Sequence, residues 1–192
     1  CMAAEETTIE QFAITAEALY ERILSNQPFA LVDVRSADLF NPNDFMDDAS
    51  LEVLHIPYTE FMDDLQSALA KLPQDKECIF ICRSGTKTRI VMSIIKDLPF
   101  EKGWVPGGLG AWRNFYDPRL AAVWPSGSLY QIARPGRGDL SYVIIDGGDA
   151  VVIDPMRNIS IYTRLIADQQ AQLVAIFDTH NHADRISGGR FL

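Results

Sequence analysis

The chain has 192 residues, a formal net charge of −9 at pH 7 and three cysteines, with an isoelectric point near 4.7. This acidic balance excludes nucleic acids and anionic membrane surfaces as expected partners. No apolar run reaches transmembrane length, and the acidic first residues lack the basic region of a secretory signal. These features favour a reducing, cytoplasmic location. The length exceeds that of a typical single domain, which predicts more than one structural unit.

Short apolar strands alternate with amphipathic helices in the first part of the chain. Apolar periodicity and end signals predict helices at residues 15–25, 58–72 and 86–98 and a buried strand at residues 78–81. Thr15 is a good N-cap for the first helix, and Pro73 ends the second. The alternation predicts a parallel sheet with helices on both faces. Ligands of such sheets lie beyond the carboxyl ends of the strands.

Cys82 stands where the strand at 78–81 meets the helix at 86–98, next to a cluster of basic residues: Arg83, Lys87 and Arg89. A helix N-terminus attracts anions through its unpaired amide groups and its dipole, and basic neighbours favour the thiolate form of a cysteine. The pattern therefore predicts a reactive nucleophile at Cys82, and a buried core residue is the alternative interpretation. Cys78, which lies inside the strand, is predicted to be a core residue.

The loop that begins at Cys82 indicates a class of anion-binding cysteine site. Cysteine-dependent protein phosphatases place an arginine six positions after the nucleophile, and Thr88 occupies that position here. Residues 82–87 instead resemble the active-site loop of rhodanese-type sulfurtransferases, Cys-Arg-x-Gly-x-Arg, with Lys87 in place of the last arginine. Lysine keeps the charge but lacks the planar guanidinium, so we expect looser oxyanion recognition, with Arg89 as a candidate to compensate. By resemblance, the substrate-binding residues are Arg83, Ser84, Gly85, Thr86, Lys87 and Arg35.

The resemblance to rhodanese-like domains extends over about residues 12 to 118. Further family patterns occur in the family's order: a strand ending in Asp-x-Arg, a His-Ile-Pro turn, a Pro-Gly-Gly turn and the helix after it, at residues 31–35, 55–57, 105–108 and 111–112. The resemblance implies an α/β fold for residues 1–118, a rhodanese-like parallel sheet flanked by helices.

The same resemblance implies an enzyme that moves sulfane sulfur through a persulfide on Cys82. The donor would be thiosulfate or a persulfide such as glutathione persulfide, and the acceptor would be a thiol. Loop amides would stabilise the developing negative charge, and no cofactor is expected for sulfur transfer. A non-catalytic sulfur-carrier or regulatory module is the alternative function of this unit. A homo-oligomer is compatible with the sequence.

Several motif residues have an ordinary structural interpretation. Asp33 and Arg35 are expected to form an ion pair that ties the first strand to the sheet, and the alternative interpretation places Arg35 in the substrate site. His55 is either a hydrogen-bonding scaffold residue or a proton shuttle. Trp112 and Phe115 are predicted to pack in the core.

Residues 119–128 are predicted to form a linker, because proline and glycine punctuate them and no periodic segment crosses them. Beyond the linker, apolar alternation and turn residues predict antiparallel strands at residues 130–133, 141–146 and 150–154. A helix at 159–170 and a buried strand at 173–177 are expected to follow.

The last strand leads into a cluster of metal-binding residue types: His180, His182 and Asp184. In a loop after a strand these side chains are positioned to converge on a cation, and their chemistry suits zinc or non-haem iron. Solvated loop residues are the alternative interpretation.

Residues 179–185 resemble the Thr-His-x-His-x-Asp-His motif of metallo-β-lactamase-fold proteins, with Arg185 in the last position. The resemblance implies that residues 129–192 are an incomplete αββα metallo-β-lactamase-like segment of a longer parent protein. That parent would join the sulfurtransferase to a persulfide dioxygenase-like domain that holds iron or zinc, in sulfide or persulfide metabolism. The alternative is a metal-dependent thioester hydrolase of the glyoxalase II type with an accessory rhodanese module. Because Arg185 replaces a ligand and the family takes further histidine and aspartate ligands from well downstream of Leu192, we expect no metallo-β-lactamase-type activity from this truncated chain.

Overall fold

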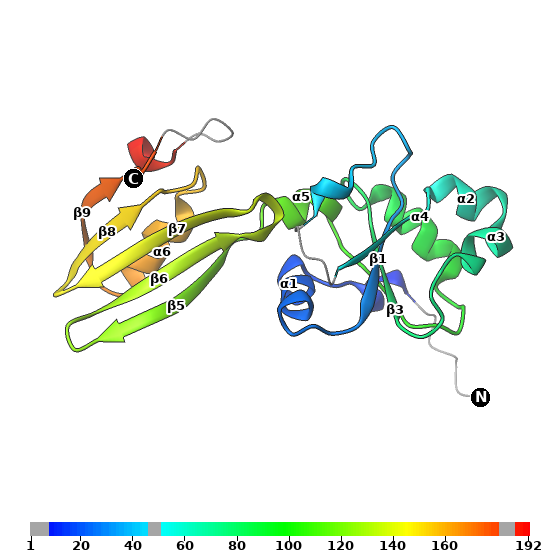
Figure 1. The fold of residues 1–192 in the computed structure, drawn as a ribbon, viewed down its shortest axis with the longest axis horizontal. Helices are drawn as coiled ribbons and strands as arrows, with labels where there is room; N and C mark the ends of the chain where they lie inside the picture. The colour runs from blue at the N-terminus through cyan, green and yellow to red at the C-terminus, as the bar shows by residue number, and fades with distance from the viewer. Residues whose placement is uncertain (1–7, 46–50, 181–186) are drawn as a thin grey trace. The chain divides into compact units, whose positions relative to one another are not determined.

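The computed structural model describes residues 8–45, 51–180 and 187–192. The chain divides into two compact units, residues 1–115 and 116–192 (Figure 1). Each unit has its own β-sheet. Within the described ranges, no helix is long and apolar enough to span a lipid bilayer.

The first unit is built on a four-stranded parallel sheet. Its strands are β1 (Phe29–Asp33), β2 (Glu52–His55), β3 (Glu77–Ile81) and β4 (Lys102–Trp104), in the spatial order β2-β1-β3-β4. The register pairs Asp33 with both His55 and Ile81, so β1, β2 and β3 end at the same edge of the sheet. Cys82 therefore follows β3 at the carboxyl edge, where parallel sheets bind ligands.

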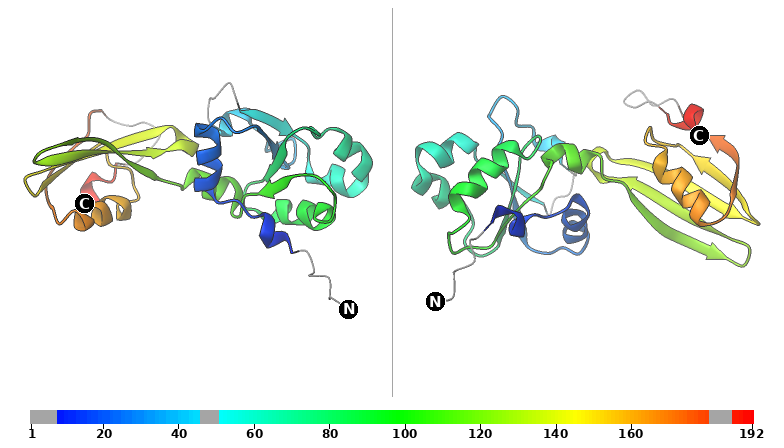
Figure 2. Two further views of the ribbon diagram at one scale, coloured as in Figure 1. Left: turned by 90° about the horizontal axis from the view of Figure 1, so that it is seen from below. Right: turned by 180° about the vertical axis from the view of Figure 1, so that it is seen from behind.

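Helices cover both faces of this sheet (Figures 1 and 2). The helical elements are α1 (Ala16–Leu24), α2 (Tyr58–Asp63), α3 (Leu65–Ala70), α4 (Thr86–Ile95) and α5 (Gly108–Arg113), with short 3-10 turns η1 (Ile9–Phe12) and η2 (Pro42–Asp44). Side chains alternate across each strand. Val32 and Phe80 thus pack with α2, α3 and α4, while Leu31 and Ile79 pack with α1 and α5. The predicted parallel sheet with helices on both faces is confirmed.

Capping side chains set where two helices of the first unit begin. The Thr15 hydroxyl accepts a hydrogen bond from the Ala18 N–H at 3.0 Å, as predicted for the N-cap of α1. The single helix predicted at residues 58–72 is wrong, because the chain breaks at Asp64 (φ −146°, ψ 85°). The Asp64 carboxylate accepts a hydrogen bond from the Ser67 N–H at 3.1 Å. Aspartate is a strong N-cap, so α3 begins as a new helix.

The second unit is a five-stranded sheet with α6 (Ser160–Asp168) packed against it. The strands follow chain order: β5 (Asp117–Trp124), β6 (Gly127–Arg134), β7 (Asp139–Asp146), β8 (Asp149–Ile153) and β9 (Gln172–Phe177). Neighbouring strands from β5 to β8 are antiparallel, and β9 is parallel to β8. Two 3-10 turns, η3 (Pro135–Arg137) and η4 (Gly189–Phe191), complete the unit's helical elements within the described residues. The αββα assignment of residues 129–192 stays a prediction.

The predicted linker at residues 119–128 is wrong, because most of these residues belong to the hairpin formed by β5 and β6. Strand β5 lies at an edge of the sheet and most of its residues are exposed. A strand is recognised in a sequence by apolar residues at alternate positions, where its side chains are buried. Because β5 buries few side chains, this alternation is weak in its sequence. Trp124, beside the turn, donates a hydrogen bond to Asp146 at 3.2 Å within the second unit.

Phe80 provides a test of the first core. Its side chain is fully buried and lies edge-on to Phe61, with ring centroids 5.9 Å apart. We expect Phe80→Ala to lower the free energy of unfolding by about 3–5 kcal/mol, because apolar contacts are lost and a cavity remains. Urea denaturation followed by circular dichroism measures this change. The control Met62→Ala, at a position that is 59% exposed, should change it by less than about 0.5 kcal/mol; equal losses would contradict this core.

Candidate active site

Cys82 begins the loop between β3 and α4. Only 2% of the residue is exposed, and its Sγ accepts a hydrogen bond from the Gly85 N–H at 3.2 Å. Gly85 is the N-cap of α4 and has a left-handed φ of +86°. A Cβ at this position would lie 2.9 Å from the Gly107 nitrogen. Both the backbone conformation and the available space therefore require glycine, and the N-terminus of α4 is directed at the thiol.

The amides at the start of α5 hold the backbone of the Cys82 loop. Leu109 donates its N–H to the Cys82 carbonyl at 2.8 Å, and Gly110 donates to the Arg83 carbonyl at 3.0 Å. Gly108 (φ +56°) approaches so closely that a Cβ would lie 2.0 Å from the Cys82 carbonyl oxygen. The sequence signal of this support is the glycine pair at the start of α5, Gly107 and Gly108, but the contact itself is not evident from the sequence.

Arg83 and Lys87 are exposed, and no carboxylate among the described residues pairs with either. Lys102 instead donates to the carbonyls of Leu98 and Phe100. The remaining described cations of the first unit pair with carboxylates; they are Arg22, Arg35, Lys71, Lys76, Arg89, Lys96 and Arg113. With the dipole of α4, the two unneutralised cations make the Cys82 loop attractive to an anion.

Three hydroxyl-bearing residues of the loop region differ in exposure. Ser84 and Thr86 are exposed, and their hydroxyl oxygens lie 3.2 Å apart. Thr88, in the position of the phosphatase arginine, is fully buried, and its Oγ1 has no partner among the described residues. The loop therefore has no guanidinium clamp at that position.

Lys87 and Arg89 are held by different partners. The Lys87 Nζ lies 4.0 Å from the centroid of the Tyr58 ring. Arg89 pairs with Glu10 at 3.2 Å and lies 5.7 Å from the Trp104 ring. Because Glu10 neutralises Arg89, the geometry does not support Arg89 as the residue that compensates for lysine at position 87.

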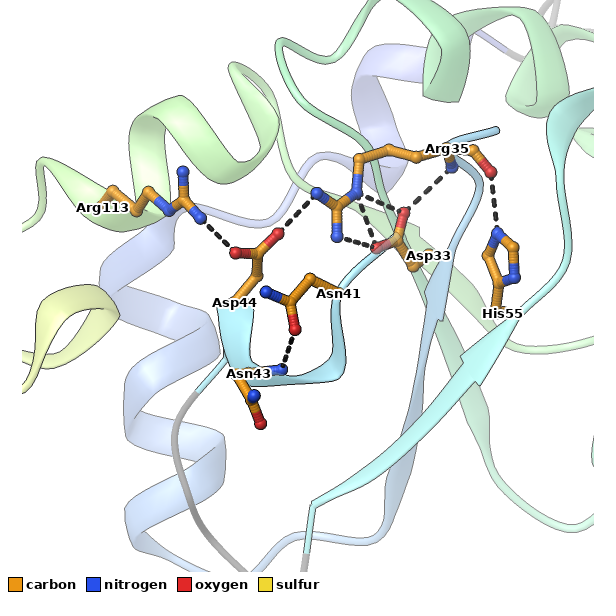
Figure 3. A network of polar contacts seen from close by, with 7 residues as sticks. All are labelled: Asp33, Arg35, Asn41, Asn43, Asp44, His55 and Arg113. Carbon is orange, nitrogen blue, oxygen red and sulfur yellow. Dashed lines mark hydrogen bonds and ion pairs between the residues drawn. The ribbon is translucent and has the colours of Figure 1, made fainter. Parts of the chain in front are cut away.

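Arg35 is 7% exposed and binds two carboxylates (Figure 3). Its Nε and Nη2 donate to Asp33 at 2.6–3.0 Å, and its Nη1 donates to Asp44 at 2.6 Å. Burial alone would lower the pKa of Arg35, but the hydrogen bonds and charges of Asp33 and Asp44 outweigh burial and raise that pKa above its usual value. Asp44 also pairs with Arg113. The geometry therefore supports the structural interpretation of Arg35 over the substrate-binding one.

His55 is held between a ring and a backbone carbonyl. Its Nε2 donates to the Arg35 carbonyl at 2.9 Å, since a carbonyl oxygen can only accept (Figure 3). The imidazole stacks on Phe40 with ring centroids 4.2 Å apart. This arrangement supports the scaffold interpretation of His55. Trp112 is buried as predicted, and Phe115 packs against the same core cluster.

One of the three predicted metal ligands lies in the described part of the chain. His180 is exposed, and its Nδ1 lies 2.9 Å from the Thr179 hydroxyl, which donates to the Asp154 carboxylate at 2.7 Å. His182 and Asp184 lie outside the described residues. Metal-ligating histidines commonly donate their other ring N–H to a carboxylate, a backbone carbonyl or water, whereas the Nδ1 contact of His180 is with a hydroxyl. The described residues contain no group of three metal-binding side chains.

Cys78 is fully buried, which confirms the predicted core cysteine. Burial, followed by the nearby charges of Glu52 and Glu77, raises the pKa of its thiol to about 11. Because the thiolate is the reactive form, we expect iodoacetamide at pH 8 to leave Cys78 unmodified in the native protein. Peptide mass spectrometry with and without urea measures this, and the urea sample is the control. Equal modification in both samples would contradict the buried position.

Gly108 tests the contact between α5 and the Cys82 loop. We expect Gly108→Ala to lower the melting temperature by several degrees, because the new Cβ would lie 2.0 Å from the Cys82 carbonyl oxygen at a left-handed φ of +56°. Gly147→Ala is the matched control, since Gly147 has a φ of +58° with no atom within 4 Å of the new Cβ. Thermal unfolding measures both variants. Equal shifts would show that backbone strain alone, and not the contact, is responsible.

No family model matches this chain. A curated Bacillus subtilis (strain 168) protein described as "Putative sulfurtransferase YtwF" is 29% identical over 106 residues, 55% of this chain and 94% of that protein. A rhodanese-related protein from Thermoplasma volcanium is 25% identical with a TM-score of 0.39, over 52% of this chain and 88% of its own. A rhodanese-like domain protein from Staphylococcus aureus is 22% identical with a TM-score of 0.41, and the match covers 52% of this chain and 89% of that protein. About half of this chain is therefore similar to a protein described as a sulfurtransferase.

Proposed function

We propose that the first unit is a sulfurtransferase that carries sulfane sulfur as a persulfide on Cys82. The observation behind this proposal is a buried thiol whose sulfur accepts a hydrogen bond from the Gly85 N–H at 3.2 Å. The loop also carries two cations without described carboxylate partners, Arg83 and Lys87. The Bacillus subtilis relative supports sulfur transfer in general. The cations favour an anionic donor, and we infer thiosulfate or a low-molecular-weight persulfide such as glutathione persulfide, with a thiol as acceptor.

Sulfur transfer takes two displacement steps at the Cys82 thiolate. In the first, the thiolate attacks the outer sulfur of thiosulfate, the sulfur–sulfur bond of the donor breaks, and sulfite leaves with the bonding electron pair. In the second, an acceptor thiolate attacks the outer sulfur of the Cys82 persulfide. The new persulfide departs and the Cys82 thiolate is restored. Both leaving groups are stable anions, so neither step requires an acid–base histidine.

The loop backbone contributes to both steps through charge stabilisation. The Gly85 N–H donates a hydrogen bond to the Cys82 sulfur, and α4 begins at the next residue. Negative charge on the sulfur is therefore stabilised by the fixed dipoles of the backbone and the helix, which do not have to reorient as water does. Arg83 and Lys87 attract the anionic donor. Their exposure leaves them open to a ligand from solvent.

For the whole protein we propose a cytoplasmic role in sulfide or persulfide metabolism, with residues 129–192 belonging to a persulfide dioxygenase-like domain. A glyoxalase II-type thioester hydrolase with an accessory sulfurtransferase unit is the alternative. Of the predicted ligands, His180 alone is described, and the described donor groups do not complete a site for iron or zinc. The proposed sulfur transfer therefore uses groups of the first unit.

Intact-mass spectrometry tests the persulfide directly. We expect the purified chain to gain one sulfur, about 32 Da, after incubation with thiosulfate or glutathione persulfide, and to lose it on addition of cyanide or a thiol. Cys82→Ser should gain no sulfur, whereas Cys78→Ser should load like the wild type because Cys78 is buried in the core.

The pattern of loading separates the alternatives. A folded wild-type chain that gains no sulfur from either donor would overturn the catalytic proposal. Sulfur that loads on Cys82 but passes to no acceptor would identify a sulfur carrier instead of an enzyme. Loading that persists in Cys82→Ser would place the nucleophile elsewhere.

A further inference from the structure

The Lys87 ammonium is held by an aromatic ring and not by a carboxylate. Its Nζ lies 4.0 Å from the centroid of the Tyr58 ring, well within the range of a cation–π interaction. Among the described residues no carboxylate lies within ion-pair distance of this ammonium. A carboxylate partner would cancel the charge of the lysine, whereas an uncharged ring restrains the side chain and leaves its charge intact.

Tyr58 is itself anchored at the carboxyl edge of the sheet. It is the first residue of α2, and its N–H donates to the Val34 carbonyl at 3.0 Å, just beyond the end of β1. Its ring is partly buried and packs against the core cluster that contains Phe61 and Phe80. The ring therefore has a fixed position, although the lysine stem above it has several rotatable bonds.

Two other cations of the first unit that lie near aromatic rings differ from Lys87. Arg89 also lies near a ring, that of Trp104, but pairs with Glu10. Lys102 lies 4.6 Å from the Phe100 ring centroid, but it is buried and its ammonium donates to backbone carbonyls. Lys87 is exposed and combines a restrained position with an available charge.

We propose that Tyr58 is a positioning residue that holds the Lys87 ammonium beside the Cys82 loop for the anionic sulfur donor. This inference rests on the proposed sulfurtransferase function. Tyr58 acts through Lys87 and takes no part in bond making, so its removal weakens binding of the donor and leaves the sulfur-transfer step unchanged.

Steady-state kinetics with thiosulfate as donor and cyanide as acceptor test the proposal. We expect Tyr58→Leu to raise the KM for thiosulfate about two- to fivefold with little change in kcat, as an exposed cation–π interaction predicts. Tyr58→Phe, which keeps the ring, should retain the wild-type KM. In a Lys87→Met background, Tyr58→Leu should cause no further rise, because the partner of the ring is already absent.

Three kinetic outcomes would overturn the proposal. A Phe variant as impaired as the Leu variant would assign the effect to the tyrosine hydroxyl. An equal rise in KM in the Lys87→Met background would show that Tyr58 acts independently of Lys87. A loss of kcat with an unchanged KM would place Tyr58 in the chemical step or in the fold.

A second measurement separates failure of this inference from failure of the proposed function. The Hε protons of Lys87 should be shifted upfield in NMR spectra by the ring current of Tyr58, and the shift should vanish in Tyr58→Leu. Lys71, which pairs with Glu60, is the control and should not change. If the chain transfers no sulfur but the upfield shift is present, the sulfurtransferase proposal fails and the contact stands. If the shift is absent from the wild type, the positioning role fails regardless of activity.

Discussion

The carbonyls of Cys82 and Arg83 accept hydrogen bonds from the Leu109 and Gly110 amides, and these two bonds hold the backbone of the loop that carries the thiol. In a trans peptide the N–H points away from the C=O, so the Arg83 and Ser84 amides, which follow these two carbonyls, point away from α5. The next amide, that of Gly85, donates a hydrogen bond to the sulfur at 3.2 Å. The proposed sulfur site is therefore made largely by backbone groups. It requires α5 to lie so close to the Cys82 loop that no side chain fits between the helix and the loop.

Cations at the carboxyl edge of the sheet have two different uses. Arg35 is buried and shared by Asp33 and Asp44, so it fixes the segment that follows β1. Removing one member of such a network leaves a buried charge without its partner, which typically costs about 3–5 kcal/mol. Arg83 and Lys87 lie at the surface without described carboxylate partners, so their charge is available to a ligand. Burial and pairing, rather than residue type, separate the structural cation from the proposed binding ones.

The features predicted from the sequence are those with local signals. The strand–loop–helix around Cys82 follows from an apolar run, a glycine and a periodic helix. The break at Asp64 was missed because an aspartate within a helical pattern becomes an N-cap only when the chain turns there. The edge strand β5 was missed because its exposed residues carry no strong alternation. The contact between Tyr58 and Lys87 joins segments distant in sequence, and a single sequence does not show which distant residues meet.

A lysine held on an aromatic ring recognises an anion differently from an arginine. A guanidinium forms paired hydrogen bonds that orient an oxyanion, whereas an ammonium acts as a point charge. In this loop the direction comes from the backbone, through the Gly85 amide and the start of α4, so Lys87 has only to supply charge. Tyr58 holds that charge in place, and a carboxylate would cancel it as Glu10 does for Arg89. In the proposed anion site a lysine can therefore occupy the position where the rhodanese pattern has its last arginine, provided that the ring beneath the lysine is kept.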